Sequence, residues 1–134
     1  MLHWTCCAGS TLLIPSGPND LKHLHVILND PIDLRQMGYA PDSCLLVGVS
    51  TVPASAPFDN TCVLQPVDHT FLTSKSFVYY KYIRMERAGD LMAKAGSGFF
   101  VPKEPIDTVI LQRLINGVQN SIHTPMWALD IPLF

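Results

Sequence analysis

Histidines are the residues in this chain best suited to chemistry near neutral pH, and two of them stand close together. His23 and His25 are two positions apart, in a segment whose alternating polar and apolar residues predict a strand. Because strand side chains alternate between faces, both imidazoles are expected on one face. With His69 or a cysteine they could form a zinc site of three or four ligands, although the spacing matches no known ligand signature. The simpler interpretation is a surface strand with two exposed imidazoles, and we expect no metal and no cofactor.

A second candidate is the dipeptide Asp68-His69, which follows the turn signal at Pro66. On a turn, the carboxylate could fix the tautomer of the imidazole and form an acid–base pair. On a regular strand the two side chains would instead point to opposite faces. In the alternative interpretation, Asp68 caps the segment that follows and His69 supports the loop.

Basic and aromatic residues are interleaved between positions 77 and 85. Lys81 and Arg84 lie among Tyr79, Tyr80 and Tyr82. Recognition of single-stranded RNA uses this combination, because cations contact phosphates while aromatic rings stack on bases. The two basic residues are three positions apart, however, and would face opposite sides of a regular strand. Tyrosine is also common in strands through propensity alone.

Composition restricts the partners that the protein can have. The chain has 134 residues, of which 48% are hydrophobic and 15% charged, which indicates a globular domain and excludes intrinsic disorder. A net charge of -2 argues against nucleic-acid binding through bulk charge, so no DNA partner is expected and RNA would need a local basic cluster. No apolar run approaches the roughly 20 residues that span a bilayer, so no membrane partner is expected.

The expected compartment is the cytoplasm. The first basic residue is Lys22, so the amino-terminal segment lacks the charged region that opens a secretory signal. In a reducing compartment, the four cysteines are expected to be free thiols. Cys62 lies within an apolar strand pattern, which favours a buried structural thiol over a nucleophile.

Apolar runs and eleven prolines predict short strands followed by two helices. The strands are expected over 11–14, 22–28, 44–52, 61–64 and 77–85, and the helices over 86–94 and from 105 to about 118. Pro105 is expected in the first turn of the second helix, and the apolar tail 126–129 is expected to pack back on the protein. We therefore predict a single domain over 1–134 that is mainly β with C-terminal helices (α+β). A small half-open β-barrel or curved antiparallel sheet over about 11–86 would be closed by a helix from the C-terminal part, about 87–134.

Four segments together resemble the PemK-like and MazF-like toxins of bacterial type II toxin–antitoxin systems. They are residues 13–18 with the strand 23–28, the strand 46–51, residues 59–64 with 68–72, and residues 76–84. The resemblance covers about residues 12–100, and the third segment is the most distinctive. It implies a small SH3-like β-barrel with helices, and a metal-independent endoribonuclease that cleaves single-stranded RNA. It also implies a homodimer and an antitoxin protein that neutralises it.

The resemblance further implies which residues form the site. In such toxins a basic residue and an acid or base near the barrel groove act through the RNA 2′-hydroxyl. The arginine that typical members carry after the first loop is not evident here, so either His25 or His23 replaces it, or this branch has lost catalysis. The predicted catalytic residues are His69, Arg84, Asp59 and His25, and the predicted substrate-binding residues are His23, Lys81 and Tyr80. The alternative function is a non-catalytic interaction module of the same fold that binds a protein partner or RNA.

Overall fold

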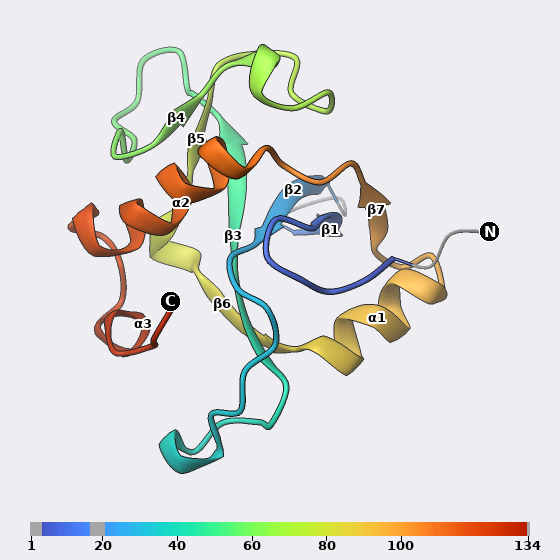
Figure 1. Cartoon of the computed structure of the whole chain (residues 1–134). Helices are drawn as coiled ribbons and strands as arrows, with labels where there is room; N and C mark the ends of the chain where they lie inside the picture. The colour runs from blue at the N-terminus through green and yellow to red at the C-terminus, as the bar shows by residue number, and fades with distance from the viewer. Residues whose placement is uncertain (1–3, 17–20, 134) are drawn as a thin grey trace.

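In the computed structural model, which describes residues 4–16 and 21–133, one antiparallel sheet is flanked by helices (Figure 1). The strands are β1 (Thr11–Pro15), β2 (Lys22–Ile27), β3 (Ser43–Thr51), β4 (Val63–Leu64), β5 (Ser76–Val78), β6 (Arg84–Arg87) and β7 (Val101–Lys103). The helices are α1 (Ala88–Gly96), α2 (Thr108–Asn120) and α3 (Met126–Leu129), with 3₁₀ turns η2 (Arg35–Met37), η3 (Pro66–Asp68) and η4 (Tyr80–Tyr82). The predicted class, mainly β with C-terminal helices, is confirmed. None of the helices in the described ranges is both long and apolar enough to cross a bilayer.

The sheet is open, with β3 at its centre. Its strand order is β4-β5-β3-β2-β1-β7, and β6 pairs separately with β3. The edge strands β4 and β7 do not pair with each other in the part of the chain that the structure describes, so the predicted barrel is not closed. Strand β7 also extends the sheet into the region for which only helices were predicted.

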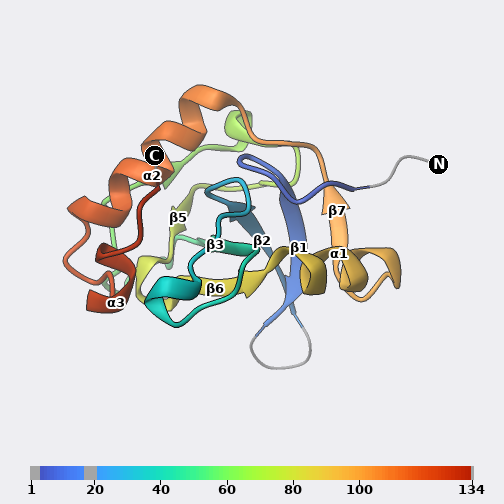
Figure 2. The ribbon, with the colours of Figure 1, turned by 60° about the horizontal axis from the view of Figure 1, so that its bottom comes forward.

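Two apolar clusters lie on opposite faces of this sheet, each covered by a helix (Figure 2). Alternation along β3 sends Leu45, Val47 and Val49 into the cluster under α2, as expected for a strand buried on both faces. Cys44 and Leu46 point the other way, into the cluster under α1. The predicted strand over 44–52 is therefore confirmed, and its two faces serve two different helices.

All four cysteines are free thiols. Cys62 is buried, and burial raises the pKa of its thiol above the ordinary value. Since the thiolate is the nucleophilic form, this environment fits the structural interpretation of Cys62. The sulfur atoms of Cys6 and Cys44 lie 3.4 Å apart in the cluster under α1.

The strand predicted over 77–85 is interrupted, which changes the direction of its tyrosines. Strand β5 pairs with one end of β3 and β6 with the other. On β3, only Val47 and Gly48 lie between these two pairings. The segment that connects β5 to β6 is longer, because it contains residues 79–83. The turn η4 takes up the excess, and regular alternation does not continue through it.

Tyr80, predicted to bind substrate, anchors helix α2 instead. Its ring is fully buried, and its hydroxyl donates a hydrogen bond to the carbonyl oxygen of Leu114 at 2.8 Å. The ring occupies the space beside Gly117, where an added Cβ would lie 1.8 Å from the Tyr80 hydroxyl oxygen. Tyr80 is therefore unavailable to a ligand because the packing of α2 on the sheet requires it.

Two boundaries near the C-terminus differ from the predictions. Helix α2 starts after Asp107, whose carboxylate accepts a hydrogen bond from the backbone N–H of Val109 at 2.8 Å. Pro105 therefore precedes the helix rather than occupying its first turn. The apolar tail 126–129 forms the short helix α3 and packs back on the protein only through the buried Ala128, whereas Met126, Trp127 and Leu129 are exposed.

The substitution Gly117→Ala tests the anchoring of α2. Alanine gains about 1 kcal/mol over glycine in helix propensity. We nevertheless expect the free energy of unfolding to fall by about 2 kcal/mol, because the new methyl group overlaps Tyr80. Urea denaturation followed by circular dichroism measures the change. Gly96→Ala is the control, because its Cβ meets no atom within 4 Å, and we expect unchanged or increased stability there. Equal stability of both variants would contradict the packing described for Tyr80.

Candidate active site

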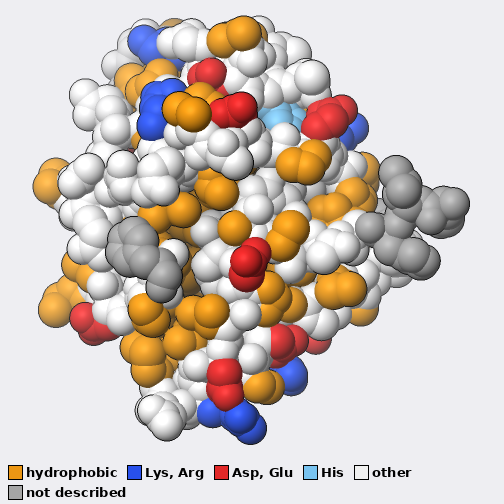
Figure 3. Space-filling model, viewed as in Figure 1, with side chains coloured by type: hydrophobic (Ala, Val, Ile, Leu, Met, Phe, Trp, Pro, Cys, Tyr) orange, Lys and Arg blue, Asp and Glu red, His pale blue; other side chains and the backbone are white. Residues whose placement is uncertain are grey.

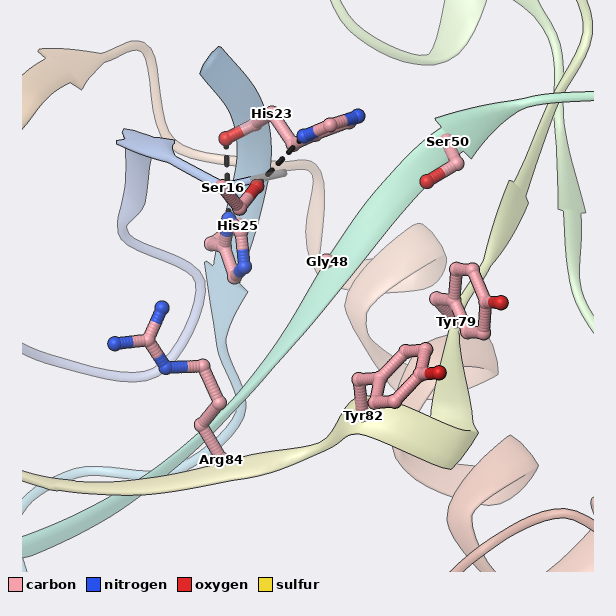
Figure 4. A pocket seen from close by; sticks show the side chains of 8 residues that line it. All are labelled: Ser16, His23, His25, Gly48, Ser50, Tyr79, Tyr82 and Arg84. Atoms are coloured by element: carbon pink, nitrogen blue, oxygen red, sulfur yellow. Dashed lines mark hydrogen bonds between the residues drawn. The ribbon is translucent and has the colours of Figure 1, made fainter. Parts of the chain in front are cut away.

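The candidate site is the part of the α1-side face of the sheet that α1 does not cover. Beyond Leu46, the next residues of β3 on this face are Gly48 and Ser50, and a cavity of about 380 Å³ lies over them (Figure 4). Its lining comes from the residue after β1, from β2, β3 and β6, and from the turn between β5 and β6: Ser16, His23, His25, Gly48, Ser50, Tyr79, Tyr82 and Arg84. The pairing of β2 with β3 thus brings both histidines of β2 to the cavity.

His25 lies flat against the strand opposite it. Gly48 is its cross-strand partner, and a Cβ at Gly48 would lie 3.0 Å from the Nε2 atom of His25. The ring thus occupies the space that a side chain at position 48 would fill. Its Nδ1 atom lies 3.0 Å from the carbonyl oxygen of His23. Because a carbonyl oxygen only accepts, Nδ1 carries the proton and Nε2 keeps its lone pair.

Burial makes His25 a neutral imidazole at physiological pH. His25 is only 6% exposed. Loss of hydration lowers its pKa to about 4, the hydrogen bond to the His23 carbonyl partly opposes this, and the positive charge of Arg84 lowers it further. His25 can therefore accept a proton through Nε2 without first losing one.

His23 is the more exposed of the two histidines and has a different partner. Its Nδ1 atom lies 2.6 Å from the hydroxyl oxygen of Ser16, the residue that follows β1. This hydrogen bond holds the ring at the edge of the cavity (Figure 4). His23 and His25 share one face, as their spacing predicts.

Arg84 provides a positive charge beside the histidines. Its Nε and one terminal nitrogen contact the same carboxylate oxygen of Glu86, at 3.1 and 2.9 Å. The other terminal nitrogen has no hydrogen-bond partner among the described residues, and the guanidinium extends to the His25 side of the cavity (Figure 4). Since guanidinium groups bind phosphate oxygens well, this is where an anionic ligand is expected.

Asp59 and Lys81 lie in a second cavity that adjoins the first. This cavity has about 480 Å³ and shares Ser50 and Tyr79 with the first. Partial burial acts to raise the pKa of Asp59, but hydrogen bonds from the Ser121 hydroxyl and from Thr61 hold it below the ordinary value. Asp59 is therefore an ionised, immobilised acceptor, and it lines a different cavity from His25.

His69 lies in neither cavity. It is buried, its Nδ1 atom accepts a hydrogen bond from the backbone N–H of Phe71, and its Nε2 atom donates to the carbonyl oxygen of Glu104 at 2.8 Å. Asp68 is engaged elsewhere, because its carboxylate accepts from the backbone N–H of Gln65 at 2.7 Å. His69 therefore supports the loop, as in the structural alternative, whereas Asp68 caps the preceding turn η3 and not the segment that follows. The two side chains do not form an acid–base unit.

The structure gives no support to the zinc alternative. Within residues 4–16 and 21–133, no three or more His, Cys, Asp or Glu side chains are grouped so that they could hold a metal ion. His69, one of the third ligands considered, is committed to the loop around Glu104. Comparison with protein-family models, curated proteins and solved structures found no match to this chain. The toxin-family resemblance therefore stays a prediction.

Sequence reasoning did not find Ser16 and Gly48, and it assigned substrate binding to Tyr80 rather than to Tyr79 and Tyr82. Gly48 lies in the site because of the β2–β3 register, which a single sequence does not provide. The tyrosine assignment depended on the unpredicted turn η4. Two sequence signals were usable: the alternation around His23 and His25, and the basic residues interleaved with tyrosines, which pointed to Arg84 and Lys81.

The buried, neutral His25 makes stability depend on pH. The folded-state pKa of about 4 lies below the ordinary value of 6.5, so the unfolded chain binds a proton first as the pH falls. Stability is therefore complete above pH 6.5 and decreases between pH 6.5 and 4, by about 3 kcal/mol for this group. Urea denaturation across this range should show a smaller decrease for His25→Gln than for the parent. The control His123→Gln replaces an exposed histidine and should retain the parent slope. A His25→Gln profile parallel to that of the parent would contradict the assignment.

Proposed function

We propose that this protein is a metal-independent endoribonuclease that cleaves single-stranded RNA with its own acid and base groups. The observation that carries the proposal is His25, a neutral imidazole whose lone pair on Nε2 faces Gly48 in a cavity that Arg84 also lines. A positioned base next to a cation is what attack by a hydroxyl group on a phosphodiester needs. In this proposal, the open sheet corresponds to the SH3-like barrel of the toxins but is not closed.

The proposed step is an intramolecular phosphoryl transfer. The ribose 2′-hydroxyl oxygen attacks the adjacent phosphorus, and its proton passes to Nε2 of His25. The bond from phosphorus to the 5′-oxygen breaks, and that oxygen takes a proton from His23. The products are a 2′,3′-cyclic phosphate and a 5′-hydroxyl end. No other reactant is consumed, because the nucleophile belongs to the substrate.

The neighbours of each histidine support these roles. In the acid role proposed for His23, the hydrogen bond between Nδ1 and Ser16 leaves Nε2–H for the leaving oxygen. Arg84 would balance the charge that develops on the non-bridging phosphate oxygens. A bound phosphodiester also opposes the effect of Arg84 on His25, since a nearby anion favours the imidazolium. Binding of substrate therefore makes His25 a stronger base.

The low net charge of the chain supports local rather than extended contacts with RNA. On the face in Figure 3, acidic and basic side chains are intermixed and form no continuous basic area. This agrees with the net charge of -2. Single-stranded RNA suits such a site better than a duplex, because its bases are free to contact protein side chains.

His25→Gln tests the role of the base. We expect the cleavage rate of single-stranded RNA to fall about 100-fold or more, since a general base contributes about 10²–10⁴-fold. The parent should release 2′,3′-cyclic phosphate ends in the presence of EDTA. Its kcat/KM should rise with pH through about 4, the pKa of the free base. A quenched fluorescent RNA measures the rate, and chromatography identifies the ends.

His69→Gln tests the site seen in the structure against the site predicted from the sequence, in which His69 was catalytic. We expect it to lower stability while the folded protein keeps the parent kcat, since His69 lies in neither cavity. Growth arrest in a bacterial host should follow expression of the parent but not of His25→Gln. RNA binding without cleavage by the parent would instead identify the non-catalytic interaction module.

Gly48→Ala tests whether the position of the His25 ring matters. The new methyl group would lie 3.0 Å from Nε2, so the ring must shift by a few tenths of an ångström. We expect kcat to fall by about tenfold or more, because small displacements of a catalytic group are costly. The acid limb of the pH profile should move to higher pH as the ring becomes better hydrated. Gly96→Ala, which meets open space, should change neither quantity. An unchanged pH profile for Gly48→Ala would show that the contact does not hold the ring.

A further inference from the structure

A row of four aromatic rings leads away from the histidines into the second cavity. We call Phe58, Phe77, Tyr79 and Tyr82 the aromatic row. Neighbouring ring centroids lie 5.4 Å apart for Phe58 and Phe77, 5.1 Å for Phe77 and Tyr79, and 4.7 Å for Tyr79 and Tyr82. Tyr82 borders the first cavity, Phe58 and Phe77 border the second, and Tyr79 borders both. The row therefore connects the two cavities.

The row presents ring surface to a ligand rather than serving only as core. Phe77 is buried beneath its neighbours, whereas Phe58 and Tyr79 are partly exposed and Tyr82 is 60% exposed. None of these four residues belongs to either apolar cluster of the core. Aromatic rings outside the core that line a connected cavity are typical of stacking platforms for planar ligands.

Charged groups border the same cavity. The Nζ atom of Lys81 lies 5.5 Å from the centre of the Tyr82 ring, and His123 also lines the cavity. The ionised Asp59, held by Ser121, adds a fixed hydrogen-bond acceptor. A ligand of this cavity would meet ring faces, a cation and an acceptor together. A nucleobase attached to a phosphate chain has matching parts: a planar face, amino donors and a phosphate.

We propose that the second cavity is a nucleobase subsite, which holds the base of a nucleotide adjoining the phosphodiester in the His25 cavity. This deepens the proposed function and rests on it for the position of the phosphodiester. The base stacks on Phe58 and Tyr79, and Lys81 lies beside the phosphate that follows. Because every base has a stacking face, the row favours unpaired RNA without dictating one sequence.

Binding of an uncleavable RNA tests the subsite separately from catalysis. The probe is a short fluorescein-labelled oligonucleotide of mixed sequence with 2′-O-methyl riboses, which lack the attacking hydroxyl. We expect Phe58→Leu and Tyr79→Leu each to weaken binding about tenfold in anisotropy titrations, as expected for one lost stacking contact. The control Tyr39→Leu replaces an exposed tyrosine outside both cavities and should bind like the parent.

A base-removal series shows whether a ring acts by stacking. Removing one base from the probe should weaken binding to the parent about tenfold at the position that occupies the subsite. The same removal should weaken binding to Phe58→Leu less than binding to the parent, because the contact of the base with Phe58 is already lost. Three results would each overturn the subsite. They are row variants that bind the probe as tightly as the parent, losses that add up in the base-removal series, and a parent that does not bind the probe. If the protein cleaves RNA but the row variants bind the probe like the parent, the subsite is wrong and the nuclease proposal stands. Binding through the row without cleavage would sink only the nuclease.

Discussion

The arrangement of this molecule depends on the alternation of side chains along β3. Three other strands, β2, β5 and β6, pair with β3, and its side chains divide between two helices. Helix α1 has nine residues and covers Cys44 and Leu46, but Gly48 and Ser50 on the same face lie beyond it. Those positions carry a glycine and a serine, residues that leave space over the sheet. The cavity exists because the strand is longer than the area that its helix covers.

The same alternation explains why His25 is buried without a charged partner. A histidine on β2 opposite a larger residue would be pushed toward solvent, but Gly48 lets the ring lie down on the sheet. The ring then loses hydration and stays neutral, and its one hydrogen bond to backbone selects the tautomer. Stability alone does not require a histidine at this position. An apolar side chain would fill the space without the loss of stability at low pH that His25 causes. Local inconsistency of this kind is typical of functional sites.

Sequence patterns predicted the elements more reliably than the contacts between them. Alternation and apolar runs predicted β1, β2, β3 and the two longer helices, because those signals are local. They also placed His23 and His25 on one face. The turn η4 was missed because it results from how β5 and β6 pair with β3. That one turn separates Tyr80, which packs on α2, from Tyr79 and Tyr82, which border the cavity. His69 was selected from its neighbour in sequence, while its actual partner, Glu104, is distant in the chain.

The turn η4 connects the stability of the fold to the shape of the site. Tyr80 is held by Leu114 and Gly117 of α2, while the rings of Tyr79 and Tyr82, on either side of this anchor, contact each other at a tilt on the open face. A shift of α2 would therefore be passed through a few backbone bonds to the aromatic row. Helix α2 lies on the other face from the histidines and contributes nothing to their cavity directly. Its sequence is nevertheless constrained by the site, since only glycine at position 117 lets Tyr80 seat fully and leaves its neighbours where a ligand can reach them.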